Sequence, residues 1–190
     1  MPDQAVDPLR VLLLPGWQNS GTGHWQSLWE AQHGYTRVQQ ADWHWPRRGD
    51  WMAALEEAVL ARMQQPGSPL LLAAHSLGCQ LVAAWAAHSQ HACHVQGALL
   101  VAPPDTARAD MPPQLASWRH VFRQRLPFAA QAVISSDDPC CALDRARAMA
   151  ADWGAAVLEL PAAGHVNADS KLGDWPQGLE LLRGLAGAST

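Results

Sequence analysis

The sequence predicts an α/β fold: a mostly parallel sheet with helices packed on both of its faces. Three observations lead to this prediction. Short β-like runs recur along the chain, segments with apolar residues at helical spacing lie between them, and most of the runs are almost wholly apolar, as in a sheet covered on both sides. Such alternation gives a three-layer sandwich with about six strands. At 190 residues the chain suits one domain, so we expect residues 1–190 to form a single unit.

The expected strands span residues 11–14, 36–40, 70–74, 98–102, 132–135 and 157–160. Helices are expected where apolar side chains recur three or four positions apart, at residues 24–32, 51–59, 77–85, 143–153 and 179–185. Asp50 directly precedes the second helix and is its expected N-cap. Residues 103–127 have only a weak pattern, which predicts a loop with a short helix and leaves too little chain for a further domain.

Charge and cysteine content narrow the classes of function. The chain has 13 Lys and Arg against 17 Asp and Glu, and the basic residues are scattered, so we expect no nucleic-acid partner. The N-terminal segment lacks the apolar core of a signal peptide, and no later apolar run approaches the roughly 20 residues of a membrane span. We therefore expect a cytoplasmic protein without a membrane partner. The four cysteines show no C-x-x-C spacing, which indicates reduced thiols.

A short motif at the end of the third expected strand contains a candidate nucleophile. Residues 74–78 read A-H-S-L-G, with Ser76 between strand and helix and small residues two positions before and after it. This resembles the nucleophile elbow, usually G-x-S-x-G, in which a sharp turn exposes the serine and needs small neighbours. Ala74 in place of the first glycine is the mildest departure. Ligands of parallel sheets bind at the carboxyl ends of the strands, so Ser76 occupies a functional position.

A serine nucleophile needs a base, and the base needs a carboxylate that orients it. Both residue types follow later strands, because residues 135–139 read S-S-D-D-P and residues 163–167 read A-G-H-V-N. We expect His165 to be the base. Asp138, directly before a proline, is the expected acid, and Asp137 is the alternative.

The expected oxyanion hole consists of two backbone N–H groups. One belongs to Leu77, the residue after the nucleophile, and the other to Trp17 in the loop after the first strand. The same loop should border a substrate pocket, with Gly16, Trp17, His24 and His75 as candidate lining residues. His24 has an alternative role as a helix-start histidine satisfied by the backbone, and for His75 we favour packing or hydrogen bonding over catalysis. We expect no cofactor and no metal, and a small acyl molecule as substrate.

Two further groups of side chains have both a chemical and a structural interpretation. Three tryptophans near the second strand could line an aromatic acyl pocket, but we favour packing. These are Trp43, Trp45 and Trp51. Three histidines could hold zinc, but they lie at the far end of the helix after Ser76, so we favour a solvated helix terminus. These are His88, His91 and His94. Cys79 is expected to be a small core residue rather than a nucleophile.

The segments around these motifs resemble a known family in combination. They read PGWQNSGTGHWQSLWE, QADWHWPRRGDW, AHSLGCQLVAAW, RLPFAAQAVISSDDP and AGHVNADS. Over nearly the whole chain, they resemble the small serine hydrolases that include bacterial YdeN-like proteins and the retinoblastoma-binding protein nine family. The resemblance implies an α/β-hydrolase fold without a cap domain, and a catalytic triad of Ser76, Asp138 and His165.

Two hypotheses about function follow. The first is a serine hydrolase that is carboxylesterase-like and acts on small or medium acyl esters, or on amides or thioesters. The second is an interaction protein that keeps the hydrolase fold. The mammalian family name implies a partner bound through an L-x-C-x-E motif, but this sequence has no such stretch, so the protein partner stays unknown. A dehalogenase or epoxide hydrolase would need a carboxylate at the elbow, and Ser76 argues against both.

Overall fold

The architecture centres on one parallel sheet. The computed structural model describes residues 9–64 and 67–187; residues 1–8, part of the segment without a signal-peptide pattern, lie outside the described residues. The sheet has six strands in the order β2-β1-β3-β4-β5-β6, and all neighbours pair in parallel. The strands are β1 (Arg10–Leu14), β2 (Thr36–Arg37), β3 (Leu70–His75), β4 (Val95–Val101), β5 (Ala129–Ser135) and β6 (Ala156–Leu160). The predicted parallel six-stranded sheet is confirmed, although β2 is shorter than expected.

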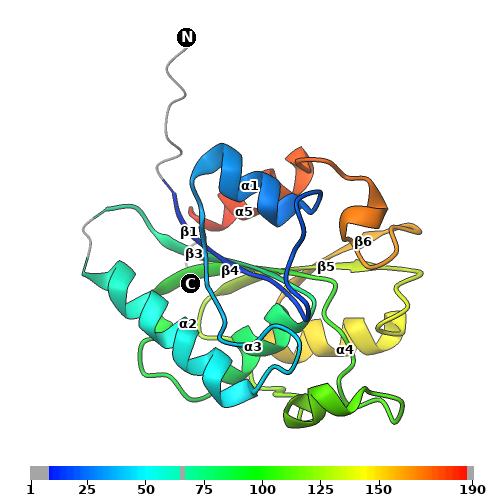
Figure 1. Ribbon diagram of the computed structural model, residues 1–190. Helices are drawn as coiled ribbons and strands as arrows, with labels where there is room; N and C mark the ends of the chain where they lie inside the picture. The colour runs from blue at the N-terminus through cyan, green and yellow to red at the C-terminus, as the bar shows by residue number, and fades with distance from the viewer. Residues whose placement is uncertain (1–8, 65–66, 188–190) are drawn as a thin grey trace.

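Helices cover both faces of the sheet, as Figure 1 shows. α1 (Trp25–His33) and α5 (Pro176–Leu185) lie on one face; α2 (Arg48–Met63), α3 (Leu77–Ala86) and α4 (Leu143–Trp153) lie on the other. The prediction that Asp50 caps α2 was wrong, because the helix begins at Arg48 and Arg47 is its N-cap. Asp50 instead lies in the first turn, where a carboxylate still interacts favourably with the positive end of the helix dipole.

The core is divided by the sheet into two apolar clusters. Successive strand residues point to opposite faces, so Val11 and Leu13 pack with α1 and α5, whereas Leu12 and Leu14 pack with α2 and α3. Six tryptophans are less than 2% exposed, and each of their indole N–H groups has an acceptor. They are Trp25, Trp29, Trp51, Trp85, Trp118 and Trp153. Burial of large aromatic rings with satisfied N–H groups therefore stabilises both layers.

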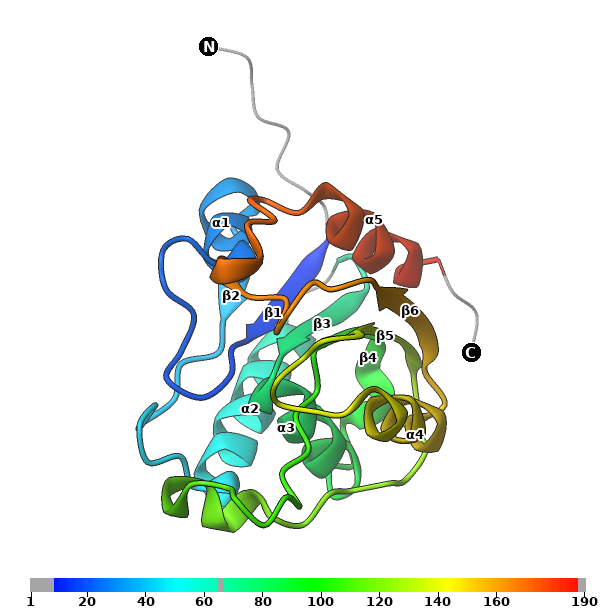
Figure 2. The same ribbon diagram turned by 90° about the vertical axis from the view of Figure 1, so that its right-hand side faces the viewer.

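The connections at the carboxyl ends of the strands are the part of the fold that positions a site. Residues 102–128, between β4 and β5, contain only the 3₁₀ helix η2 (Pro113–Trp118), so no cap domain is inserted there. In Figure 2 the orange segment after β6, which includes η3 (Ala168–Ser170), crosses to α1, and Trp25 Nε1 donates to Val166 O at 3.0 Å. A further 3₁₀ helix, η1 (Ala92–His94), precedes β4. Within the described ranges, no helix combines the length and the apolar character of a membrane span.

Candidate active site

Ser76 lies in a strained turn between β3 and α3. Its φ of 54° and ψ of −123° lie outside the regions that residues other than glycine usually adopt. Such a conformation costs of order 1–3 kcal/mol and persists only where neighbouring contacts hold it. The Ser76 N–H donates to Val101 O at 2.9 Å, and Ser76 O accepts from Cys79 N at 2.9 Å. These bonds hold the turn, so that the half-buried hydroxyl stands at the end of the sheet.

Small residues around Ser76 allow this turn to pack. A Cβ added to Gly78 would lie 2.2 Å from Leu14 O, which is backbone of the neighbouring strand. A Cβ added to Gly16 would lie 2.7 Å from Ser76 Cβ. Ala74, which replaces the usual first glycine of the motif, is fully buried, and its methyl group fits. The A-H-S-L-G segment therefore has the close packing of a nucleophile elbow.

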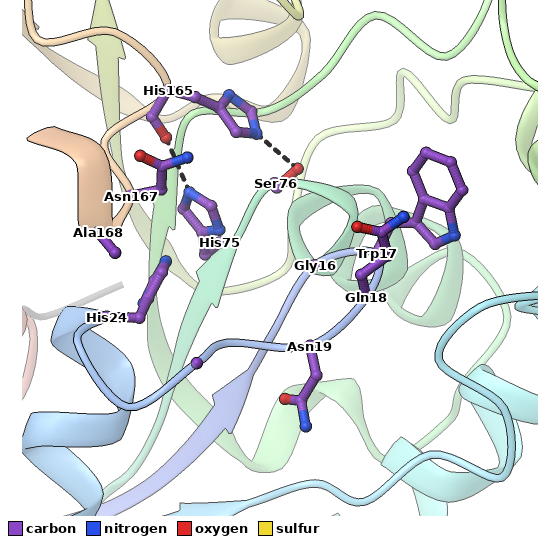
Figure 3. A pocket seen from close by; sticks show the side chains of 11 residues that line it. Gly16, Trp17, Gln18, Asn19, His24, His75, Ser76, His165, Asn167 and Ala168 are labelled. Atoms are coloured by element: carbon purple, nitrogen blue, oxygen red, sulfur yellow. Dashed lines mark hydrogen bonds between the residues drawn. The ribbon is translucent and has the colours of Figure 1, made fainter.

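The three residues predicted as a triad form one hydrogen-bonded series. His165 Nε2 lies 2.8 Å from Ser76 Oγ, and Figure 3 shows this bond. His165 Nδ1 lies 2.9 Å and 3.0 Å from the two carboxylate oxygens of Asp138, whose side chain is 4% exposed. Asp137, the alternative acid, does not bond the imidazole; its Oδ1 accepts from Ser135 Oγ and Gly164 N, each at 2.8 Å. Of the two candidate acids, Asp138 is therefore the one that contacts the imidazole of His165.

The environment of His165 determines its protonation. Burial lowers its pKa, but the hydrogen bond and charge of Asp138, together with the neighbouring Cys140 thiol, outweigh burial and raise the pKa to about 9. Because the carboxylate can only accept, His165 Nδ1 carries a proton. In the neutral ring Nε2 is then unprotonated and can accept the Ser76 proton, as a general base must.

The loop that carries His165 is held from three sides. Trp25 Nε1 donates to Val166 O, as described above, and Asp137 accepts from Gly164 N. His75 Nε2 lies 2.9 Å from His165 O, and since a carbonyl only accepts, this nitrogen of His75 is the donor. Burial, followed by the nearby His24 and His165, lowers the pKa of His75 well below its ordinary value, so the ring stays neutral. His75 thus has the hydrogen-bonding role that we favoured.

The two residues predicted to form an oxyanion hole, Trp17 and Leu77, border a cavity together with Ser76. Leu77 is the first residue of α3, and Trp17 follows β1, which pairs directly with β3. Among the described residues, neither N–H donates to a protein acceptor. The next N–H along the loop, that of Gln18, is used by Trp43 O at 3.0 Å. The backbone N–H groups of Trp17 and Leu77 are therefore without an acceptor in the described part of the chain, and their role as an oxyanion hole stays a prediction.

Arg37, which belongs to no sequence motif, holds the loop that carries Trp17. Its side chain is only 7% exposed and extends from β2. The guanidinium donates to Asn19 Oδ1 at 2.6 Å, Ser20 O at 3.0 Å and Ser27 Oγ at 2.7 Å, and it forms an ion pair with Glu30. Since Gln18 and Asn19 both have left-handed φ values near 68°, these bonds fix a loop that would otherwise relax.

Two cavities meet at Ser76. The first, which we call the histidine cavity, measures about 300 Å³ and is bordered by His165, Asn167 and all four predicted pocket residues. Those four are Gly16, Trp17, His24 and His75. The second, the apolar cavity, measures about 310 Å³ and is bordered by Leu77, Pro104, Met111, Pro112 and Leu115. Ser76 and Trp17 border both cavities, so a molecule bound at the hydroxyl can extend in two directions.

The remaining candidates lie outside this site. Trp51 packs in the core against Trp118 and Trp43, as favoured, whereas Trp45 is 55% exposed and does not pack. Cys79 is fully buried, and burial raises the pKa of its thiol, which fits a core residue.

The three histidines with zinc-like spacing are separately engaged. His88 Nδ1 bonds Ala84 O at 2.8 Å, and His91 Nδ1 bonds Glu56 Oε1 at 2.6 Å. The rings of His91 and His94 stack with their centroids 6.2 Å apart. Within the described ranges, these histidines do not form a group that could share one metal ion.

Comparison with solved structures places the fold among the α/β hydrolases. A protein described as a YdeN-like hydrolase from Pectobacterium atrosepticum is 26% identical, with a TM-score of 0.79 over 94% of this chain and 90% of that one. The ydeN gene product of B. subtilis is 21% identical, with a TM-score of 0.72 over 93% and 97%. Est1E from Butyrivibrio proteoclasticus, solved with ferulic acid bound, is 12% identical, with a TM-score of 0.64 over 97% and 88%. No curated protein sequence matches the chain.

The sheet order, the elbow and these likenesses define an α/β hydrolase. More narrowly, the serine hydrolase family matches residues 11–184, so the chain belongs to that family. The matched range contains all three residues of the Ser76–His165–Asp138 series.

Proposed function

We propose that this hydrolase cleaves small or medium acyl esters through a covalent acyl-enzyme, with Ser76 as nucleophile, His165 as base and Asp138 as orienting acid. The observation that carries the proposal is the unbroken hydrogen-bonded series from Asp138 through His165 to the hydroxyl of Ser76. Amides and thioesters would follow the same steps.

The mechanism uses the same groups in both halves of the reaction, with His165 acting first as base and then as acid in each. His165 Nε2 takes the proton of Ser76 as Oγ bonds to the acyl carbon, and the N–H groups of Trp17 and Leu77 stabilise the resulting oxyanion. The tetrahedral intermediate collapses, the bond to the leaving group breaks, and protonated His165 gives that group its proton. Water then attacks the acyl carbon while His165 Nε2 takes a proton from it. The bond between the acyl carbon and Ser76 Oγ breaks, His165 returns the proton to Oγ, and the carboxylic acid is released.

The two cavities suggest which part of the substrate lies where. The leaving group must accept a proton from His165, and of the two cavities it is the histidine cavity that His165 borders. The acyl chain then extends into the apolar cavity, where Leu77, Met111 and Leu115 offer apolar contacts. Burial of one CH₂ is worth about 0.8 kcal/mol, which corresponds to about fourfold in kcat/KM per added carbon until the cavity is full.

Labelling with a fluorophosphonate probe tests the proposal without knowledge of the substrate. The probe reacts with an activated serine, and peptide mapping identifies the labelled residue. We expect label on Ser76 in the wild type and none in Ser76→Ala or His165→Ala variants that retain the fold. Absence of label from a folded wild type would refute an activated Ser76 and direct attention to the interaction-protein hypothesis.

A series of p-nitrophenyl esters then tests the acyl assignment. We expect kcat/KM to rise from acetate to butyrate and to fall for long chains that exceed the apolar cavity. Substitution of Met111 or Leu115 by a larger residue should shorten the preferred chain. A preference that does not change in either variant would contradict the assignment of this cavity.

A further inference from the structure

One buried nitrogen in the histidine cavity has no partner in the protein. His24 is 4% exposed and lies at the N-terminus of α1, where it acts as the N-cap. Its Nδ1 accepts from Gln26 N at 3.2 Å. Its Nε2 is buried and has no hydrogen-bond partner among the described residues. An unpaired buried polar atom costs about 1–3 kcal/mol, so this nitrogen needs an explanation.

The cap fixes which nitrogen of His24 carries the proton. Because Nδ1 accepts from a backbone N–H, it has no proton of its own, and in the neutral ring the proton is on Nε2. Burial, together with Arg37 and His165, lowers the pKa of His24 to about 4, so the ring is neutral in a neutral solution. Nε2–H is therefore an uncharged donor. Figure 3 shows the outer ring nitrogen of His24 pointing into the space beside His75 and Ala168.

Asn167 supplies a second donor to the same space. Its Oδ1 accepts from Asp169 N at 3.0 Å, which assigns the other side of the amide to Nδ2. Among the described residues no acceptor takes a hydrogen bond from this Nδ2, and Figure 3 shows the Asn167 side chain pointing into the cavity. No carboxylate borders the histidine cavity within the described part of the chain. The cavity thus offers donors to a ligand and no negative charge.

We propose that the histidine cavity recognises a carbonyl oxygen on the leaving group, which accepts hydrogen bonds from His24 Nε2–H and Asn167 Nδ2. The substrate class is then an acyl ester whose alcohol carries a carbonyl group, rather than a plain alkyl ester. This inference rests on the proposed function, because His165 must border the leaving-group side. The scissile bond lies at Ser76, and the carbonyl lies deeper in the cavity toward α1.

A pair of esters with leaving groups of similar shape tests the inference. The butyrate ester of glycolamide carries a carbonyl, and isobutyl butyrate has methyl groups in its place. The variant His24→Ser keeps a good N-cap, and its short side chain has no group that extends to the position of Nε2 in the cavity. The control His33→Ser lies at the other end of α1, outside the cavity. For each protein we take the ratio of kcat/KM for the glycolamide ester to kcat/KM for the isobutyl ester. Comparing this ratio between variant and wild type cancels the different intrinsic reactivities of the two esters.

We expect His24→Ser to lower this ratio about 5- to 100-fold, mainly through KM, whereas His33→Ser leaves it unchanged. If His24→Ser does not fold, Asn167→Asp serves instead: it keeps the acceptor for Asp169 N, replaces the donor by an acceptor, and should lower the same ratio. An unchanged ratio in a folded variant refutes carbonyl recognition. Fluorophosphonate labelling of the wild type separates the two failures, because an unchanged ratio in a labelled enzyme leaves the proposed function intact.

Discussion

The contact between Gly16 and Ser76 allows a substitution whose effect can be worked out from distances. An alanine Cβ at Gly16 would lie 2.7 Å from Ser76 Cβ and 3.2 Å from Ser76 Oγ. Carbon atoms in ordinary contact are about 3.5–4.0 Å apart, so Gly16→Ala creates an overlap of about 1 Å. Gly16 is not among the glycines with positive φ, so alanine adds no backbone strain there.

The overlap must be relieved by a movement of either Ser76 or the loop. If Ser76 moves by about 1 Å, its 2.8 Å bond to His165 is lost, and such a misplacement costs about 10²-fold in rate. If the loop moves, the N–H of Trp17 leaves the oxyanion, which costs about 10²- to 10³-fold. Either movement predicts a fall in kcat of at least about 10²-fold, or about 2.7 kcal/mol in activation free energy.

The assay is kcat for p-nitrophenyl butyrate, with the rate of fluorophosphonate labelling as a second measure. Overpacking costs about 1–3 kcal/mol of stability, so thermal unfolding is followed to show that the assayed protein is folded. Gly23→Ala in the same loop is the matched control, because its Cβ would meet only Ala168 Cβ at 3.9 Å. Activity of Gly16→Ala within threefold of Gly23→Ala would refute the reasoning.

Three other predictions concern the groups around Ser76. Asp138→Asn should lower kcat about 10³- to 10⁴-fold, whereas Asp137→Asn should mainly lower thermal stability, and equal kcat values in the two variants would contradict the assignment of the acid. Since His165 must be neutral to act as base and its pKa is raised to about 9, kcat/KM should rise with pH and level off above about 9; a pH profile that is flat between 6 and 10 would contradict this. Arg37→Lys keeps a charge but not the planar set of donors, so kcat should fall about tenfold and the free energy of unfolding by about 2–3 kcal/mol in denaturant titrations, with Arg37→Ala worse in both. Wild-type values for Arg37→Lys would show that the loop is held by other contacts.

The sequence predicted the sheet well because the four central strands, β1, β3, β4 and β5, are buried on both sides and their apolar composition is pronounced. It overestimated β2, which is an edge strand with pairing only at Thr36 and Arg37. It misplaced the start of α2, because Asp50 has the residue type of a cap while the chain already turns into the helix at Arg48. Local composition does not record where an element begins, and β4 and β5 likewise start three residues before their predicted first residues, at Val95 and Ala129.

The triad candidates were found from order along the chain, since Ser76, Asp138 and His165 each follow a strand. Asp137 and Asp138 share the same sequence context, and only the direction of their side chains separates them. Arg37 was missed because a lone arginine in a strand has no motif, although it joins four partners of one loop and helix. Residues that act through hydrogen bonds to distant backbone leave little signal in a single sequence.

The three residues of the candidate site follow β3, β5 and β6, so the site is assembled from half of the sheet. Strand β6 pairs only with β5, at the edge of the sheet, and the loop after it supplies His165. Parallel pairing between distant segments forms slowly, because loop closure must precede each contact. During refolding, Ser76 should therefore become reactive toward a fluorophosphonate only when the edge strand β6 has docked. The rate at which this reactivity appears would then measure the rate at which the sheet is completed.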